Sequence, residues 1–157
     1  MSYNLEKKIS IMGILNITPD SFYDGGRYTD TESTLARVRE MLDQGVDIID
    51  IGAESTRPGS LPVSLDEELS RLIPIVSEIR KISKIPLSID TTKADVIQKL
   101  IQYEIQIIND ISAGSDNVMI KLAKDNGLHI SLMHMQKKPE IMQEEPSYKN
   151  VIGEIYS

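Results

Sequence analysis

The sequence has no cysteine, no tryptophan and a single phenylalanine, Phe22. Without cysteine, a disulfide scaffold and any cysteine-ligated metal are excluded, and the composition fits a protein of the cytoplasm. Because large aromatic residues are so few, the core must consist mainly of Ile, Leu, Val and Met. Hydrophobic residues make up 40% of the chain, which is enough for a sizeable core in one domain spanning residues 1–157.

Other signals are missing as well. No stretch approaches the ~18 consecutive apolar residues of a membrane span, and the apolar run 9–17 is too short and too often interrupted for the core of a signal peptide. A net charge of −7 argues against non-specific binding to nucleic acid or to anionic lipid. Neither glycine-rich nucleotide fingerprint, GxGxxG or GxxxxGK(S/T), occurs. We therefore expect neither a nucleic acid nor a membrane as partner, whereas an anionic small ligand stays possible because a local site can oppose the overall charge.

What the chain does contain is an alternation of short apolar runs with amphipathic segments. Between the runs, apolar residues recur at steps of three and four, which predicts four helices and the start of a fifth at Ser147. The second helix should start at Ser64, which forms a capping-box pair with Glu67, and the fourth should stop at Gly127. Strands that alternate with helices indicate a parallel sheet, and strands without polar alternation indicate burial on both faces. The predicted strands are Ile9–Leu15, Val46–Ile51, Ile85–Ile89, Ile105–Ile108 and His129–Met133.

Polar residues stand where the predicted strands end. In a (β/α)8 barrel such strand ends converge and build the active site. An Asn or Asp at a strand end can also simply start a loop or cap the following helix. Five such positions in a row favour the barrel, so we predict an α/β fold of the TIM-barrel class, here an incomplete barrel of about five βα units. The residues are Asn16, Asp50 with Glu54 just beyond it, Asp90, Asn109 with Asp110, and His134.

Two loops carry candidate ligands of a metal and a phosphate. Asn16 precedes a long polar loop with glycines, and its neutral amide oxygen is a suitable ligand for Mg²⁺. Thr56 and Arg57 lie in a turn bounded by Pro58 and Gly59, where their donors can hold a phosphate. An ordinary Asx turn is the alternative for Asn16, and a solvated side chain is the alternative for Arg57.

The third and fourth predicted strands end in Asp90 and Asn109. A carboxylate and an amide on neighbouring strand ends can bind a heterocycle that shows an N–H next to a ring nitrogen, because Asp accepts while Asn both donates and accepts. At the end of the fifth predicted strand, Met133 and the nearby Met135 can form a soft apolar wall beside a flat ring. Plain packing in a barrel is the commoner role of two such methionines.

These residues lie in a series of recognisable runs: MGILNITPDSF with DGG, then ESTRPGS, SIDTTKADVI, IINDISAG and LMHMQ. In order and spacing the series is similar to dihydropteroate synthases, from about Ile11 to about Tyr156. The first two runs are specific to that family, whereas SIDT and IND also occur in other pterin-binding barrels, including methyltetrahydrofolate-dependent methyltransferases. The resemblance implies a TIM barrel that joins (7,8-dihydropterin-6-yl)methyl diphosphate to 4-aminobenzoate in folate biosynthesis, giving 7,8-dihydropteroate and diphosphate.

The resemblance also implies roles for single residues. Asp90 and Asn109 match the pair that binds the pterin ring, and Asp90 is expected to be catalytic because its charge favours the developing cation. Met133 matches a wall residue of the pterin pocket. Asn16 matches the asparagine that binds Mg²⁺, which is the expected cofactor.

The remaining implied roles fall in the two loops. Thr56 matches a threonine that binds the substrate beside the diphosphate, and Arg57 is expected to face the diphosphate as a second catalytic residue. Phe22 and Pro58, together with Asp20, match the loops that shape the 4-aminobenzoate pocket. Members of the family are expected to be homodimers, an expectation that we do not extend to a chain of this length.

The chain departs from the family in length. A closed barrel usually needs ~250 residues. The family's later pterin-binding aspartate, its Ser-Arg-Lys lysine and its Arg-x-His pair have no counterpart in these 157 residues. We therefore expect an N-terminal fragment that alone neither turns over substrate nor forms a well-behaved monomer. The alternatives are a remnant that at most binds pterin, one half of a two-chain barrel, and a methyltransferase-type pterin barrel, against which the TPDSF and ESTRPG runs argue.

Overall fold

The computed structural model describes residues 9–18, 31–54, 62–137, 141–142 and 145–156. Strands and helices alternate along the chain, as predicted. The strands are β1 (Met12–Asn16), β2 (Ile48–Gly52), β3 (Leu87–Asp90), β4 (Ile107–Asp110) and β5 (His129–Leu132). The helices are α1 (Thr31–Asp43), α2 (Leu65–Ile82), α3 (Ala94–Leu100) with the 3-10 turn η2 (Ile101–Tyr103), α4 (Asn117–Asn126) and α5 (Val151–Tyr156).

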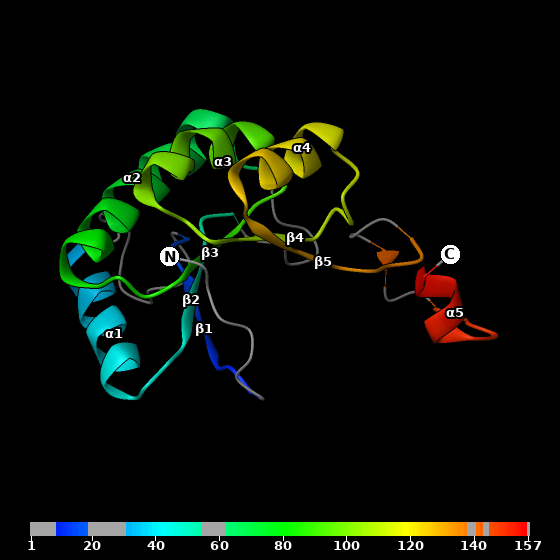
Figure 1. Ribbon diagram of the computed structural model, residues 1–157, viewed down its shortest axis with the longest axis horizontal. Helices are drawn as coiled ribbons and strands as arrows, with labels where there is room; N and C mark the ends of the chain where they lie inside the picture. The colour runs from blue at the N-terminus through cyan, green and yellow to red at the C-terminus, as the bar shows by residue number, and fades with distance from the viewer. Residues whose placement is uncertain (1–8, 19–30, 55–61, 138–140, 143–144, 157) are drawn as a thin grey trace.

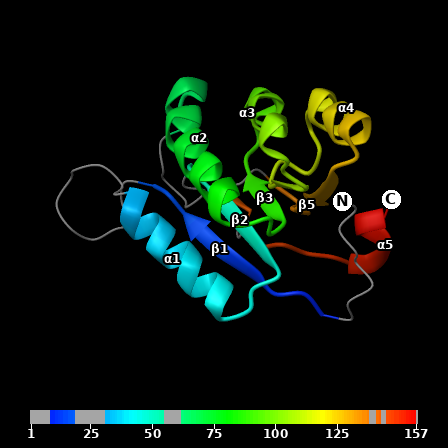
Figure 2. The same cartoon turned by 60° about the vertical axis from the view of Figure 1, so that its left-hand side comes forward.

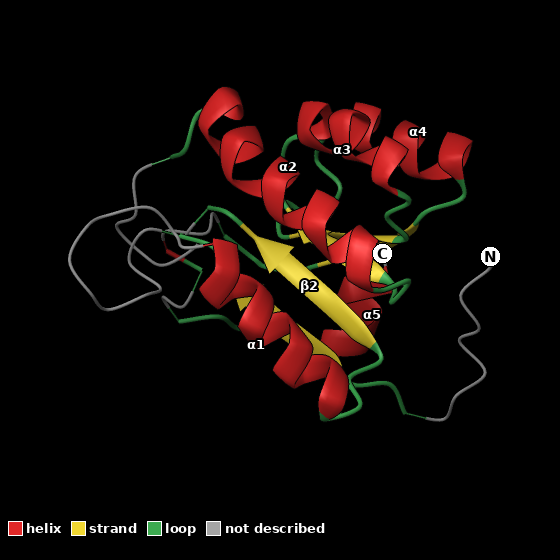
Figure 3. Cartoon of the chain, turned by 90° about the vertical axis from the view of Figure 1, so that its left-hand side faces the viewer, coloured by secondary structure: helices red, strands yellow, loops and turns green. Residues whose placement is uncertain are grey.

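All five strands form one parallel sheet in the order β1-β2-β3-β4-β5. Helices α1–α4 lie on one face of this sheet and form an arc around it (Figures 1 and 2), and Figure 3 shows α1 and α2 in front of β2. Helix α5 lies apart from the arc, beyond β5 (Figure 1). Strands in sequential order with helices on the outside are typical of a (β/α)8 barrel, whereas a doubly wound sheet reverses its strand order and carries helices on both faces. The described strands therefore form an incomplete barrel, which confirms the predicted fold class.

The core lies between the sheet and the arc of helices. Its fully buried members on the central strands include Ile49, Ile51, Leu87, Ile89 and Ile108. Burying one such side chain stabilises the fold by roughly 1.5–3 kcal/mol. Within the described residues, no helix is long and apolar enough to cross a membrane.

Burial on both faces, which the apolar runs predicted, holds for β2 but not for the outer strands. All five residues of β2 are buried, whereas Ile14 of β1 is 65% exposed and most of β5 is exposed. The reason is that, among the described strands, β1 and β5 each pair with a single neighbour, so that they lie at the two edges of the sheet. Gly13 of β1 faces the helices instead, because a Cβ there would lie 3.0 Å from Met41 Sδ.

Four of the five predicted strands begin two or three residues too early, whereas β5 begins at His129 as predicted. Val46 and Ile85 pack against the core from the connections that precede β2 and β3, and buried Ile105 does the same before β4. These residues are apolar because of packing and not because of strand pairing, so a run of apolar residues misplaces the start of the strand.

Two helix boundaries agree with their sequence signals. Ser64 Oγ accepts a hydrogen bond from the backbone N–H of Glu67 at 3.3 Å, which caps the start of α2. Gly127 ends α4 in the left-handed region at φ 63°, where glycine carries no steric penalty.

Candidate active site

Four neighbouring strands each place one residue at the same level of the sheet. The register pairs Asn16 with Gly52, Gly52 with Asp90, and Asp90 with Asn109. Side chains alternate along a strand, and the preceding residues, such as Ile89, point into the core. The four residues therefore lie on the opposite face, away from α1–α4, and we refer to them as the polar row. The structure thus brings together three of the residues that the sequence singled out as candidates.

Gly52 leaves a gap in the middle of the polar row. A Cβ at this position would lie 3.2 Å from Asp90 Oδ2 and 3.4 Å from Asn16 Oδ1. The gap is therefore bordered by two side-chain oxygens, and a side chain at this position would crowd both of them. Sequence reasoning missed Gly52, although a glycine at the end of a buried strand often marks a close approach by a ligand or another backbone.

Asp50 orients Asn109 from the layer beneath the polar row. The Asn109 amide nitrogen donates to Asp50 Oδ2 at 3.1 Å, and Asp50 is only 4% exposed. The second carboxylate oxygen, Oδ1, is buried without a hydrogen-bond partner among the described residues. With its nitrogen bonded to Asp50, Asn109 keeps its amide oxygen as an acceptor for a ligand donor. The sequence showed Asp50 near a strand end but could not show this contact.

The carboxyl group of Asp90 has a shifted pKa. Burial raises the pKa of Asp90 to about 6, with further contributions from the carboxylates of Asp50, Glu68, Glu54 and Asp110. At neutral pH the group is therefore mostly ionised but close to its midpoint. Carboxyl groups with a pKa raised by burial and by neighbouring carboxylates cluster at functional sites.

Asp110 does not join the polar row, although it adjoins Asn109. It is fully buried, and its carboxylate accepts from the backbone N–H groups of Ser112 at 2.7 Å and Gly114 at 2.9 Å. Its role is to shape the turn after β4. The simpler interpretation of a strand-end aspartate, that it starts the next loop, holds at this position.

The end of β5 also differs from the prediction. The strand stops at Leu132, and His134 lies two residues beyond it, where its Nε2 is 3.1 Å from the Tyr148 hydroxyl. The prediction that His134 ends the strand is therefore wrong. Met133 is partly buried, and its backbone N–H donates to the Asp110 carbonyl oxygen at 3.0 Å. By alternation with Ser131, which pairs with Asn109, Met133 lies on the face of the polar row.

The other candidates fall in parts of the chain that the structure does not describe. These are Phe22 with Asp20, and the run Thr56, Arg57 and Pro58. Their roles remain predictions.

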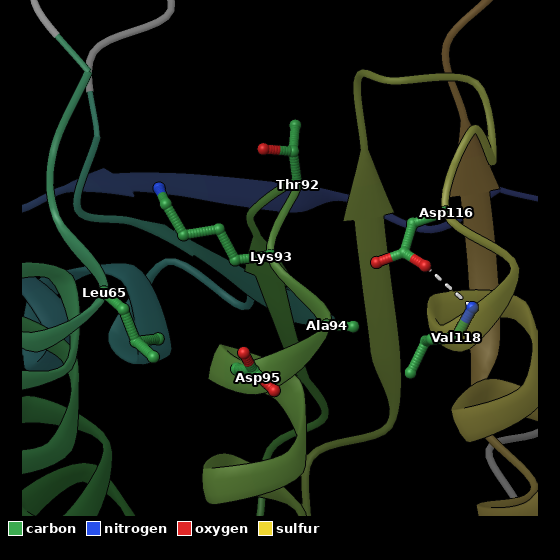
Figure 4. Close-up of a pocket in the computed structure, with 7 residues that line it drawn as sticks. All are labelled: Leu65, Thr92, Lys93, Ala94, Asp95, Asp116 and Val118. Carbon is green, nitrogen blue, oxygen red and sulfur yellow. Dashed lines mark hydrogen bonds between the residues drawn. The ribbon is translucent and has the colours of Figure 1, made fainter.

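An open hollow lies on the helix side of the sheet, with a volume of about 390 Å³. No member of the polar row lines it, and Asp116 at its edge is occupied as the cap of α4, where it accepts from Val118 N–H at 2.8 Å (Figure 4). In the same figure Lys93 extends away from these two residues. The hollow is therefore separate from the polar row. Its lining consists of Leu65, Thr92, Lys93, Ala94, Asp95, Asp116 and Val118.

The sequence of residues 12–157 matches a family that is described as pterin binding enzyme. The chain belongs to the pterin-binding enzyme family. Within this family, the dihydropteroate synthase of Escherichia coli strain K12 is 43% identical over 145 residues, which are 92% of this chain and 51% of that protein.

Two solved structures of pterin-binding enzymes share the fold. The Yersinia pestis dihydropteroate synthase in complex with a sulfonamide drug has a TM-score of 0.82 and 41% identity, over 94% of this chain and 54% of that one. The Burkholderia cenocepacia dihydropteroate synthase complexed with 7,8-dihydropteroate has a TM-score of 0.74 and 38% identity, over 96% of this chain and 50% of that one. This chain spans about half the length of the family members that it matches.

Proposed function

We propose that this chain carries the pterin-binding part of a dihydropteroate synthase. The reaction condenses (7,8-dihydropterin-6-yl)methyl diphosphate with 4-aminobenzoate to give 7,8-dihydropteroate and diphosphate. The observation that carries the proposal is the polar row, in which Asp90 and Asn109 adjoin each other on paired strands beside the gap at Gly52. The similarity to dihydropteroate synthases supports it. We propose the cytoplasm as the place of this reaction, in keeping with the absence of cysteine.

The pterin ring fits the donors and acceptors of this row. Its amino group and the neighbouring ring N–H are two donors side by side, which an ionised Asp90 accepts. Asn109, held by Asp50, offers its amide oxygen to the same edge of the ring. Met133, on the same face, would cover the flat side of the ring with a soft apolar surface.

In the proposed reaction, the amine nitrogen of 4-aminobenzoate forms a bond to the pterin methylene carbon. The bond from that carbon to the diphosphate oxygen breaks, and the amine releases one proton to solvent. Positive charge develops on the pterin as the diphosphate departs, and the negative charge of Asp90 stabilises it. By resemblance, Thr56 and Arg57 hold the diphosphate, whereas Phe22 and Pro58 border the 4-aminobenzoate.

The residues present fit Mg²⁺ that is bound together with the diphosphate. Among the described residues, no group of three or more His, Asp and Glu side chains could hold a metal ion by itself. Asn16 offers one neutral amide oxygen at the gap beside Gly52, and Mg²⁺ commonly takes few protein ligands and completes its shell with water and phosphate oxygens. When bound, Mg²⁺ would neutralise part of the charge of the leaving diphosphate.

Replacing Asn16 with alanine should weaken binding of the diphosphate end of the substrate but not of its pterin end. We expect the Mg²⁺-dependent affinity for (7,8-dihydropterin-6-yl)methyl diphosphate to fall by about 10- to 100-fold, because a protein ligand of the Mg²⁺ on the diphosphate is lost. Affinity for 6-hydroxymethyl-7,8-dihydropterin, which has no diphosphate, should stay within about twofold of wild type. Isothermal titration with both compounds measures the difference. An equal loss for both would contradict the assignment of Asn16 to the metal and diphosphate.

Replacing Gly52 with alanine should block the gap in the polar row. The added methyl group would crowd Asp90 and Asn16 by a few tenths of an ångström, so we expect pterin affinity to fall on the order of tenfold or more. Stability should change little, because alanine suits a strand better than glycine. Gly13→Ala is the matched control. Its methyl group would meet Met41 on the helix side, so it should lower the unfolding temperature and spare pterin affinity.

The pH dependence of pterin binding tests the proposed function itself. Because the pKa of Asp90 is raised to about 6, the carboxylate is present above that pH and lost below it. If binding needs the carboxylate, affinity for 6-hydroxymethyl-7,8-dihydropterin should fall roughly tenfold between about pH 7 and about pH 5. In Asp90→Asn the same titration should be flat over this range. A wild-type chain that binds no pterin at about pH 8 would refute the proposal.

A further inference from the structure

Asp50 is a buried carboxylate with few polar contacts. It lies in the middle of β2 and is only 4% exposed. Its Oδ2 accepts a hydrogen bond from the side-chain nitrogen of Asn109 at 3.1 Å, whereas its Oδ1 is buried without a hydrogen-bond partner among the described residues. None of the ion pairs that join described residues includes Asp50.

Stability gives no reason for a carboxylate at this position. A carboxylate that leaves water loses strong hydration, and a single hydrogen bond from a neutral amide does not replace it. Asparagine has the same shape and could accept the same hydrogen bond without that cost. Ser88, the residue paired with Asp50 on β3, is also fully buried, and within the described part of the chain its hydroxyl has no partner. The reason for the carboxylate therefore lies in what it does to Asn109.

The hydrogen bond from Asn109 to Asp50 crosses a whole strand. Asp50 belongs to β2 and Asn109 to β4, and β3 runs between them. Neighbouring strands lie about 4.8 Å apart, so both side chains must lean over β3, where the small side chain of Ser88 leaves them room. Asp90, two residues after Ser88 on β3, pairs with Asn109 in the register. The bond therefore lies next to the two residues that we propose to bind the pterin ring.

A carboxylate fixes the direction of the Asn109 amide, and an amide in its place would not. A carboxylate only accepts hydrogen bonds, so it holds the nitrogen of Asn109 on its own side and leaves the amide oxygen for a ligand. An asparagine in place of Asp50 could donate as well as accept. The Asn109 amide could then turn over, with its oxygen towards position 50 and its nitrogen towards the ligand.

This direction matters for the kind of ring that binds. In a pterin, the amino group at position 2 donates hydrogen bonds, and the adjoining ring nitrogen N1 accepts them. In a lumazine, an oxygen replaces the amino group, so position 2 accepts and N1 carries a hydrogen. The two rings have nearly the same shape. A site can therefore distinguish them only by the direction of its hydrogen bonds, and the wrong ring leaves buried polar groups unpaired.

We propose that Asp50 determines the specificity of the site, because by holding the Asn109 nitrogen it makes the site select a ring with an amino group at position 2 over a ring with an oxygen there. In this role Asp50 touches no substrate and is a positioning residue that acts through Asn109. The inference rests on the proposed function and deepens it, since it states which ring the site accepts and which it rejects.

The test compares the two rings in wild type and in Asp50→Asn. The quantity is the ratio of the dissociation constant of 6-hydroxymethyl-7,8-dihydrolumazine to that of 6-hydroxymethyl-7,8-dihydropterin, measured by competitive isothermal titration at about pH 7. We expect this ratio to fall on the order of tenfold in Asp50→Asn, because the turned amide matches the lumazine and leaves the amino group of the pterin without its partner.

Asp90 does not account for such a fall. As an acceptor it disfavours the lumazine in both proteins. The charge of Asp50 contributes to the raised pKa of Asp90, so its removal lowers that pKa and leaves Asp90 more fully ionised at neutral pH. This change by itself would raise the ratio slightly, so a fall reports on Asn109.

Ser88→Ala is the matched control. It removes a buried polar group from the residue paired with Asp50, but no hydrogen bond to a described residue. The ratio should therefore stay within about twofold of wild type. Asp50→Asn should keep or raise the unfolding temperature, because it removes a buried charge that has one unpartnered oxygen.

A second measurement needs no ligand. In wild type the Asn109 nitrogen donates to a buried oxygen, so one hydrogen of its side-chain amide should exchange slowly with solvent, as followed by NMR. In Asp50→Asn the nitrogen is free to turn away, and both hydrogens should exchange faster. In Ser88→Ala the slow exchange should persist.

Two results would overturn the inference. One is an unchanged ratio in Asp50→Asn. The other is an equal loss of affinity for both compounds together with a lower unfolding temperature, because Asp50 would then only support the fold. If the wild-type chain binds neither compound, the proposed function fails and the selection of the ring fails with it. The exchange of the Asn109 hydrogens then still supports or overturns the positioning of Asn109 by Asp50.

Discussion

Replacing Asp90 with alanine should weaken pterin binding by about 2–4 kcal/mol, because a charged partner is removed from a desolvated ligand. This corresponds to a roughly 30- to 1000-fold rise in the dissociation constant for 6-hydroxymethyl-7,8-dihydropterin. Isothermal titration at about pH 8, well above the raised pKa of about 6, measures the effect with the carboxylate fully ionised.

The stability of the fold should not decrease together with pterin affinity. The pKa of Asp90 is raised in the folded chain, so its charged form is less favourable there than in the unfolded chain, and stability falls as pH rises through about 6. Removing the charge with Asp90→Asn should therefore keep or raise the unfolding temperature at neutral pH while binding is lost. Asp95→Ala, an exposed carboxylate on α3, is the control and should leave both unchanged. Unaltered pterin affinity in Asp90→Ala would refute the assignment.

Replacing Lys93 with methionine should cost about 3 kcal/mol of unfolding free energy. The substitution leaves Glu68 charged, fully buried and without its partner. Removing one partner of a buried ion pair costs far more stability than removing one partner of an exposed pair. Burial lowers the pKa of Lys93, but its bonds to Glu54 and Glu68 outweigh this and raise it. The stabilisation should therefore be present at neutral pH and disappear only as the lysine deprotonates at high pH.

Chemical denaturation of three variants checks this expectation. Lys81→Met removes the lysine of an exposed pair with Glu78 on α2 and should cost no more than about 1 kcal/mol. The double substitution Lys93→Met with Glu68→Leu should recover much of the stability, because both partners are then replaced by apolar groups. If Lys93→Met were as mild as Lys81→Met, the ion pairs of Lys93 with Glu54 and Glu68 would contribute nothing to the fold.

The sequence by itself determined the architecture. Apolar residues form short β-branched runs in the strands and recur at steps of three and four in the helices. Both patterns follow from the local geometry of the backbone alone. Local signals also set helix ends, since Ser64 bonds to a backbone group three residues away and Gly127 adopts a conformation that other residues avoid. The polar residues at the ends of the predicted strands could also be identified from the local sequence, and they indicated a site at one end of a barrel.

Most strand boundaries could not be predicted from the sequence. Ile105 is as apolar as the strand residues that follow it, yet it packs from the connection before β4. Whether such a residue pairs with a neighbouring strand depends on where that strand lies, which local sequence does not encode.

Only the tertiary structure decided which polar residues share a site. Asn109 and Asp110 are neighbours in sequence, but alternation sends one to the open face and the other into the turn after β4. The Asp50–Asn109 bond spans 59 residues, and the bonds from Lys93 to Glu54 and Glu68 span 39 and 25. These contacts exist because parallel pairing and the packing of α2 bring distant segments together, and long-range geometry of this kind leaves no periodic trace in the sequence.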